Sequence, residues 1–215
     1  MSRKIQHFRK KFTIFCEGDT EYHYFDAMRV NQGVELALKP INMHGGGYSN
    51  FLDVIKIDSK NNCLAKFIII DLDRLHKHQG EKQNLIELIK YCDLQNNKRN
   101  VPHFLIIDNP DFEYLACLHI PKYNGQEVAR YIEKQLGFEI EEFKAKKDIY
   151  NYLNSYGNSC EMMLSRLSVK KTFVRNIFSI TQSSMEVFIK QTHIDWEQID
   201  TKGSNIHELF EIIDW

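Results

Sequence analysis

The chain has 215 residues, of which 43% are hydrophobic and 27% charged, the composition of a folded globular protein and not of a disordered chain. Its 28 Lys and Arg residues nearly balance its 29 Asp and Glu residues, so the net charge of −1 creates no overall field that attracts a polyanion. Nucleic-acid binding stays open, because it depends on where basic residues cluster and not on their total. The 5 cysteines are scattered singly, which disfavours both a disulfide framework and a structural zinc site.

The N-terminal sequence MSRKIQHFRKK lacks the apolar stretch of a secretory signal. No apolar run approaches the length of roughly 18 residues that a membrane-spanning helix needs. We therefore expect a soluble, cytoplasmic protein without a membrane partner.

Short apolar runs alternate with helical patterns in the first half of the chain. Strands are expected at 11–16, 34–43, 64–70 and 102–107, and helices between them at 20–30, 50–59 and 83–91. The run 66–70 has apolar residues on both alternate faces, which is typical of a central strand that helices cover on both sides. The alternation predicts an α/β fold with a mostly parallel, four-stranded sheet flanked by helices.

After residue 121 the pattern becomes helical and more charged, at 128–136, 148–156, 161–167 and 205–215. No strand as strong as the earlier ones is expected there. The sequence therefore predicts a core domain at 1–120 and a C-terminal helical extension at 121–215 that packs on the core.

The first group of acids follows the first expected strand. Glu17 ends that strand, Gly18 permits a tight turn, and Glu21 lies four residues further on, so a helix can bring both carboxylates to one side. Asp19 or Thr20 is expected to cap this helix. In the alternative interpretation, Glu17 is a solvated turn residue and Glu21 only stabilises the helix N-terminus.

The second group follows the most apolar strand. Asp71 and Asp73 are two residues apart, so in extended backbone both point to the same side. Two close carboxylates repel each other unless a cation lies between them, and oxygen ligands suit Mg²⁺ or Mn²⁺. The alternative is a solvated loop, because a lone pair of this kind occurs by chance in many proteins.

The third group follows the fourth strand. Asp111 is expected to be the N-cap of a helix and Glu113 to lie in its first turn, and capping alone explains both. The carboxyl ends of parallel strands meet at one edge of a sheet. If these strands are neighbours, the three groups therefore form one cluster of carboxylates that can bind metal.

A glutamate after the first strand and a DxD motif after a later one resemble the Toprim fold, and the surrounding stretches resemble its RloB-like branch. The stretches are CEGDTE at 16–21, YF at 24–25, DLD at 71–73, NPDFE at 109–113, LH at 118–119 and SNIHEL at 204–209. The chain departs from the branch at Asp111, where a small residue is usual, and at 114–117, where a tryptophan is usual.

The resemblance implies a Toprim-like core and a Mg²⁺-dependent endonuclease, a hydrolase that acts as the toxic effector of an anti-phage, abortive-infection system. By the same resemblance Glu17, Glu21, Asp71 and Asp73 match the catalytic, metal-binding acids. The implied substrate is RNA, including tRNA, in preference to DNA, and the implied partner is an ATPase of the ABC or AAA type. A homodimer is also expected. The alternative is a non-catalytic sensor or regulatory subunit of an ATPase-containing defence complex.

Substrate contacts are expected from residues beyond the acids. Asn109 and Glu113 lie on a motif of the branch, and His76 and His78, in the loop after the DxD motif, can contact substrate phosphate. The basic clusters are Arg3, Lys4 and 9–11; Lys144, Lys146 and Lys147; and Lys170, Lys171 and Arg175, the last with Phe173 and Phe178 nearby for stacking on bases. The alternative is that each cluster is only a solvated surface.

Overall fold

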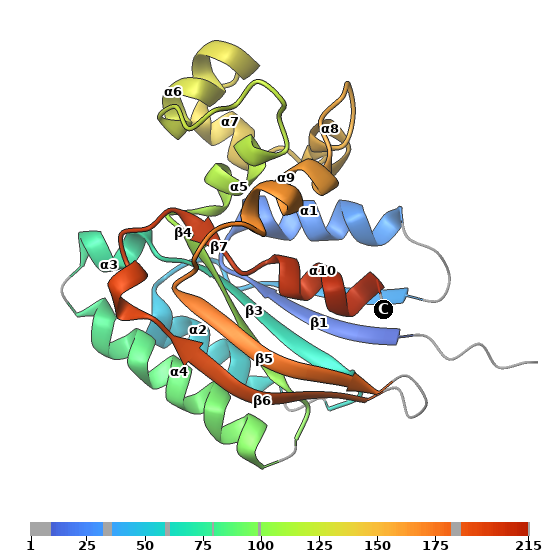
Figure 1. Ribbon diagram of the computed structural model, residues 1–215, viewed down its shortest axis with the longest axis vertical. Helices are drawn as coiled ribbons and strands as arrows, with labels where there is room; N and C mark the ends of the chain where they lie inside the picture. The colour runs from blue at the N-terminus through green and yellow to red at the C-terminus, as the bar shows by residue number, and fades with distance from the viewer. Residues whose placement is uncertain are drawn as a thin grey trace, which may run out of the picture.

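The computed structural model describes residues 10–31, 36–58, 61–78, 80–98, 100–181 and 186–214. Its main sheet has five strands in the order β2-β1-β3-β4-β7 (Figure 1). The strands β1 (Lys10–Cys16), β2 (Leu36–Asn42), β3 (Ala65–Asp71) and β4 (His103–Asn109) are parallel, and β7 (Gly203–Ser204) is antiparallel to β4. The predicted α/β class and mostly parallel sheet are confirmed, whereas the predicted strand number is wrong because it omits β7.

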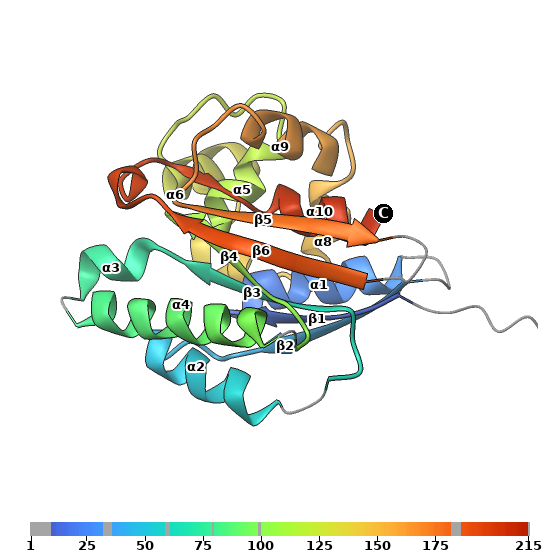
Figure 2. The same cartoon turned by 60° about the horizontal axis from the view of Figure 1, so that its bottom comes forward.

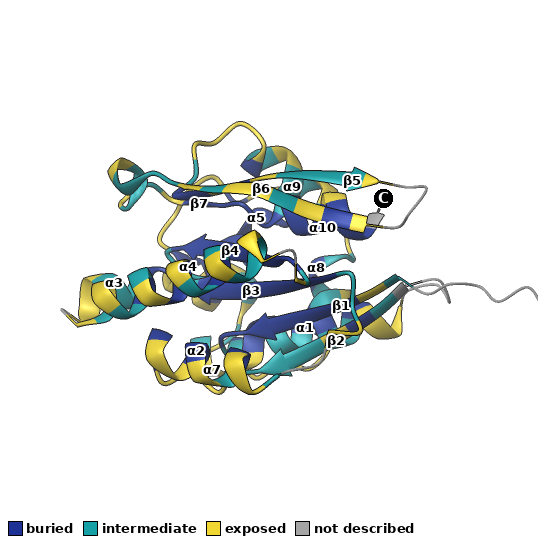
Figure 3. Cartoon of the chain, turned by 90° about the horizontal axis from the view of Figure 1, so that it is seen from below, coloured by how far each residue is buried: buried dark blue, intermediate teal, exposed yellow. Residues whose placement is uncertain are grey.

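Helices cover both faces of this sheet (Figures 1 and 2). The helices α2 (Tyr48–Ile57) and α4 (Glu81–Asn97) pack on one face, and α1 (Asp19–Val30), α5 (Phe112–Leu118) and α10 (His207–Asp214) pack on the other. The short helix α3 (Asp73–Lys77) follows β3 directly. Alternate residues of β3 contribute to the two cores, Ile68 to the first and Ile69 to the second. Burial on both faces (Figure 3) explains why this strand is the most apolar run of the chain.

The segment after residue 121 is only partly helical. Besides α10, its helices are α6 (Val128–Tyr131), the π-helix η1 (Ile132–Leu136), α7 (Ile140–Lys144), α8 (Ile149–Leu153), α9 (Cys160–Leu167) and the 3-10 turn η2 (Trp196–Gln198). Between α9 and η2 the strands β5 (Val174–Thr181) and β6 (Glu186–Ile194) form an antiparallel hairpin.

The prediction of a wholly helical extension is therefore wrong. In β5 the buried Val174 and Asn176 alternate with the exposed Arg175 and Ile177, as expected when only one face of a strand is covered. Such alternation is a weaker signal of a strand than the continuous apolar runs of the core strands. The strand β7 has only two residues, which is too short to show any alternation of apolar and polar residues. The division at residue 120 stays a prediction, although β7 joins the main sheet and α10 packs on its face.

Buried amide side chains cover the part of the β4 edge that β7 leaves open. The carbonyl oxygen of Leu105 accepts hydrogen bonds from Asn176 Nδ2 and Asn205 Nδ2, both at 3.0 Å, and Asn205 Oδ1 accepts from the Ile107 N–H at 2.9 Å. Glu208 accepts hydrogen bonds from both asparagines. An open edge would leave backbone groups unpaired, so this part of the 204–209 stretch has a structural role.

The turn before α2 requires glycine at position 47, where φ is +96°. A Cβ atom there would lie 2.3 Å from Oε1 of Glu81, whose Oε2 accepts the Tyr48 N–H at 3.0 Å. We expect Gly47→Ala to lower the free energy of unfolding by roughly 2–4 kcal/mol. Gly45, with φ of +66° and open space around its Cα, is the matched control, and Gly45→Ala should cost about 1 kcal/mol. Urea denaturation measures both, and equal losses would show that contact with Glu81 is unimportant.

Among the described residues, no helix combines the length and the apolar character that crossing a bilayer demands.

Candidate active site

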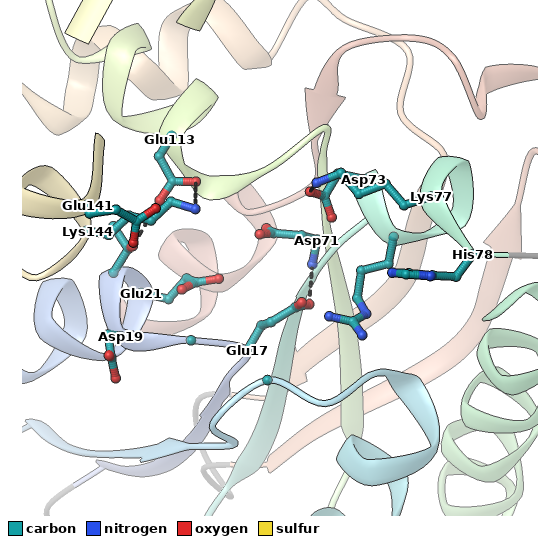
Figure 4. Close-up of a pocket in the computed structure, with 14 residues that line it drawn as sticks. Glu17, Asp19, Glu21, Asp71, Asp73, Lys77, His78, Glu113, Glu141 and Lys144 are labelled. Atoms are coloured by element: carbon teal, nitrogen blue, oxygen red, sulfur yellow. Dashed lines mark hydrogen bonds and ion pairs between the residues drawn. The ribbon is translucent and has the colours of Figure 1, made fainter. Parts of the chain in front are cut away.

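Acidic side chains gather where the carboxyl ends of β1, β3 and β4 meet (Figure 4). The group comprises Glu17 after β1, Glu21 in α1, Asp71 at the end of β3, Asp108 in β4 and Glu113 in α5. Asp71 and Asp108 are register partners on neighbouring parallel strands, so their side chains emerge on the same face. Four of the five are buried, with exposures from 0% at Asp108 to 8% at Glu17. The structure thus brings Glu17, Glu21 and Asp71 together, as expected for acids that follow neighbouring parallel strands.

Hydrogen bonds to the backbone hold two of these carboxylates in place. Glu17 Oε2 accepts the Asp71 N–H at 2.8 Å, which joins the end of β1 to the end of β3. Asp71 Oδ1 accepts the Phe112 N–H at 3.1 Å, which joins β3 to α5. The acids therefore fix the relative positions of three elements at the site.

The predicted helix caps have different outcomes. Asp111 accepts the Tyr114 N–H at 2.9 Å and is the N-cap of α5, as predicted. The prediction that Asp19 or Thr20 caps α1 is wrong, because α1 begins after Gly18 without a side-chain cap. The Thr20 hydroxyl instead donates to Glu113 Oε1 at 2.9 Å.

Burial and mutual repulsion raise the pKa values of the whole group. Burial raises the pKa of Glu17 to about 7, against the opposing effects of the Asp71 N–H and the Arg74 charge. The pKa of Glu21 is raised well above its usual value by burial and by the charge of Glu113. Burial and the charge of Glu21 likewise raise the pKa of Asp71 well above its usual value. Ionising these carboxyl groups together is therefore unfavourable unless a cation joins them.

The donor set fits a divalent cation. Glu21 Oε1 and Asp108 Oδ2 are buried and have no hydrogen-bond partner among the described residues. Burial raises the pKa of Asp108 to about 7. Unpartnered buried carboxylate oxygens are costly, and they are the ligands that Mg²⁺ and Mn²⁺ prefer.

The carboxylates do not form a finished ligand set. Within the described ranges, no three His, Cys, Asp or Glu side chains are arranged to hold one metal ion. The carboxylates of Glu17, Asp71 and Glu113 each accept a hydrogen bond from an N–H or hydroxyl group of the protein. These hydrogen bonds hold the carboxylates apart from one another. Figure 4 shows Glu21 and Asp71 turned toward a shared space.

Four of the five acids, all but Asp108, line a hollow of about 320 Å³, which we call the acidic hollow, and basic side chains line it as well. These are Arg74, Lys77, His78 and Lys144. The Nε atom of Arg74 is buried and has no hydrogen-bond partner among the described residues, and Lys144 Nζ lies 3.9 Å from Glu113 Oε2. Acids that can bind a cation and bases that can bind a phosphate therefore share one hollow.

Sequence reasoning missed Arg74 and Lys77 as bases of this hollow, whereas His78, which the sequence predicts as a phosphate contact together with His76, does line it. Arg74 follows the DxD motif directly, and Lys77 lies four residues after Asp73, on the same side of α3. Asp73, the first residue of α3, lines the acidic hollow and forms an ion pair with Lys77.

Two predicted substrate contacts lie elsewhere. Asn109 is buried, and its Nδ2 donates to the carbonyl oxygens of Ile199 and Thr201, both at 2.8 Å. His76 is exposed, lies 3.8 Å from Asp200 Oδ1, and is not among the residues lining the acidic hollow. The amide of Asn109 is thus occupied in holding the loop before β7.

The third predicted basic cluster lines a separate hollow. Lys170, Lys171 and Arg175 lie there together. The expectation that Phe173 and Phe178 stack on bases is wrong, because Phe173 is buried against Trp196 and Phe178 packs on Phe104. Arg3, Lys4 and Arg9 of the first cluster lie outside the described residues.

The raised pKa values predict that the metal-free chain loses stability as the pH rises. A carboxyl group whose pKa is higher in the folded than in the unfolded chain favours folding while protonated, and this stability disappears as the pH rises through the folded pKa. For Glu17 and Asp108 that value is about 7. We expect the melting temperature in EDTA to be on the order of 5 °C lower at about pH 8 than at about pH 5.5. The buried His103 and His119, whose pKa values burial lowers to about 4, act in the opposite direction, so scanning fluorimetry compares wild type with Glu17→Gln. A fall in melting temperature that is no larger in wild type than in this variant would contradict the electrostatic account.

Comparison of the chain with protein-family models, with curated proteins and with solved structures finds no match.

Proposed function

We propose that this protein is a metal-dependent phosphodiesterase that cleaves nucleic acid as an endonuclease. One observation carries the proposal: a group of buried acids with raised pKa values opens into a hollow that basic side chains also line. Perturbed acids in a hollow are typical of functional sites. Carboxylates that hold a divalent cation beside phosphate-binding bases are the equipment of phosphodiester hydrolysis.

Each side chain has a place in this proposal. Glu21, Asp71 and Asp73 would hold Mg²⁺ or Mn²⁺, with Asp108 and Glu113 beside them. Bound there, the cation would neutralise phosphate charge and stabilise the charge that develops on the attacking and leaving oxygens.

Glu17 is the proposed general base. Without a cation its pKa is about 7, and a cation bound beside it would lower that value, so the ionised carboxylate could accept a proton from the attacking water near neutral pH. Arg74 and Lys77, which line the same hollow, would orient the phosphate by charge-assisted hydrogen bonds.

The wider biological role rests on the resemblance to the RloB-like branch of Toprim proteins. It supports RNA over DNA as substrate, a toxic effector role in anti-phage defence, and an ATPase partner. The proposal that these acids bind metal is supported by the position of Glu17 and Asp71 at the ends of the adjacent strands β1 and β3, with Glu21 in the first turn of α1 beside them.

One observation favours the non-catalytic alternative. Glu17 and Asp71 bind the backbone N–H groups of Asp71 and Phe112, so these acids also tie the ends of β1, β3 and α5 together. In a sensor or regulatory subunit, Glu17 and Asp71 would serve only to hold these elements together. Such a subunit would need no divalent metal for its effect.

Cleavage on a gel separates the two functions. Wild type, Glu17→Gln and Asp71→Asn are incubated with total RNA and with plasmid DNA, in Mg²⁺ or in EDTA. Glu133→Gln, at an exposed position of η1, is the control. We expect cleavage by wild type and the control in Mg²⁺ only, and loss of cleavage in the other two variants. Cleavage that survives Asp71→Asn or EDTA would reject the proposed site, and no cleavage of either polymer would favour the sensor.

A further inference from the structure

A second hollow, of about 450 Å³, lies where the start of β5, the end of β6 and the N-terminus of α10 meet. We call it the basic hollow. The side chains that give it this character are Lys170, Lys171 and Arg175, and His193 and His207 line it beside them. They come from the loop after α9, from both strands of the hairpin and from α10, so residues distant in the sequence converge on one place (the elements can be followed in Figure 2).

The hairpin geometry directs two of these residues to one side. Arg175 and His193 are register partners in the antiparallel pair, so their side chains project from the same face. The next residue, Asn176, projects into the core and binds Glu208. Alternation along β5 therefore places Arg175 in the basic hollow while its neighbour anchors the hairpin.

The basic hollow has an excess of positive charge. Lys170, Lys171 and Arg175 are exposed, and the acid that lines the hollow with them is Asp195, whose Oδ1 accepts the Glu197 N–H at 3.1 Å. Glu211 lies in a neighbouring hollow that Arg175 also lines. Within the described part of the chain, the side chains of Lys171 and Arg175 form no ion pair. The charge of Lys171 is therefore available to an anionic ligand, and the charge of Arg175 also acts on the buried Glu208, where it opposes the rise in pKa that burial causes.

The helix α5 connects this hollow to the acidic one. Lys170 Nζ donates a hydrogen bond to the Tyr114 hydroxyl and lies 5.1 Å from the centre of the Tyr114 ring. Lys202 Nζ lies 5.9 Å from the same ring. Glu113, the residue before Tyr114, lines the acidic hollow. Of two consecutive residues of α5, Glu113 thus lines the acidic hollow and Tyr114 contacts a lysine that lines the basic one.

We propose that the basic hollow binds backbone phosphates of a nucleic-acid strand whose scissile phosphodiester lies in the acidic hollow. The second half of this inference rests on the proposed function. A mononucleotide has its phosphates at one end only, whereas a strand can place phosphates in both hollows. No Phe, Tyr or Trp side chain is among the lining residues that the structure describes there, so binding depends on charge and not on the identity of the bases.

Charge reversal tests the inference. The variant Lys171→Glu/Arg175→Glu is compared with Arg130→Glu/Lys134→Glu, in which the same residue types are exchanged at exposed positions of α6 and η1. Fluorescence anisotropy in EDTA measures binding of a labelled single-stranded RNA of about 20 nucleotides, and of DNA of the same sequence. We expect the first variant to bind at least about tenfold more weakly than wild type, and the dependence of log Kd on log salt to fall by about 1.4. The control should bind within about twofold of wild type.

The outcomes separate this inference from the proposed function. Selective loss of binding supports the basic hollow even if wild type never cleaves nucleic acid. Equal losses in both double variants would overturn it, since they would reflect net charge alone. Unchanged RNA and DNA binding together with lost binding of a polyglutamate peptide would also overturn it and would indicate a protein partner.

Discussion

Glu21→Gln is expected to stabilise the metal-free chain and at the same time to abolish its response to divalent metal. Glu21 is 3% exposed, and its Oε1 has no hydrogen-bond partner among the described residues. The charges of Glu113 and Glu17 oppose its ionisation. Glutamine has nearly the same shape without the charge, so the repulsion disappears together with a proposed metal ligand.

Both effects of Glu21→Gln, the gain in stability without metal and the loss of the response to metal, should be large. At about pH 8 in EDTA we expect the melting temperature of Glu21→Gln to exceed that of wild type by roughly 3–6 °C. Adding Mg²⁺ should raise the melting temperature of wild type but not that of the variant, and the cleavage rate of the variant should fall by at least about 100-fold. Glu141→Gln, an exposed acid that lines the same hollow, is the control and should behave as wild type. A variant that is less stable in EDTA and still gains stability from Mg²⁺ would contradict the proposed role of Glu21.

Asn205→Ala is expected to cause the largest loss of stability among the substitutions considered. The side chain of Asn205 forms three buried hydrogen bonds, to the Ile107 N–H, the Leu105 carbonyl oxygen and Glu208 Oε2. Alanine would leave backbone groups of the β4 edge and a buried carboxylate without these partners. The cost of each unsatisfied group is about 1–3 kcal/mol, so we expect the free energy of unfolding to fall by roughly 3–5 kcal/mol.

Urea denaturation measures this loss, and an exposed residue of the helix that follows Asn205, α10, provides the control. Glu211→Ala should change the free energy of unfolding by no more than about 0.5 kcal/mol. A loss below about 1 kcal/mol for Asn205→Ala would mean that water replaces the side chain at the strand edge.

The four parallel strands could be predicted from the sequence because the physics that places them is local. The expected strands 11–16, 64–70 and 102–107 correspond to Lys10–Cys16, Ala65–Asp71 and His103–Asn109. Each is a short run of apolar residues covered on both faces, which leaves a continuous signal. The proximity of Glu17, Glu21 and Asp71 follows from the same rule, because β1 and β3 are parallel neighbours.

The remaining features depend on partners far away in the sequence. Asn109 is held by carbonyl groups of residues 199 and 201, and Asp108 binds Ser204 Oγ at 2.6 Å. The β5–β6 hairpin is half-buried, and its place is fixed by the hydrogen bonds of Asn176 to β4 and α10. Such contacts have no spacing that a single sequence reveals. For the same reason, the charges on Lys170, Lys171 and Arg175 could be noticed, whereas the hollow that they share with His193 and His207 could not.

Binding of Mn²⁺ is the most direct test that the buried acids form a divalent-metal site. Electron paramagnetic resonance detects free Mn²⁺, so titration into the protein at about pH 8 reports the bound fraction without requiring a substrate. We predict that wild type removes Mn²⁺ from the free signal in a saturable manner, and that Glu21→Gln binds it at least about 100-fold more weakly. A free-ion signal that grows in proportion to added Mn²⁺ from the first addition, in wild type as in the variant, would contradict the account.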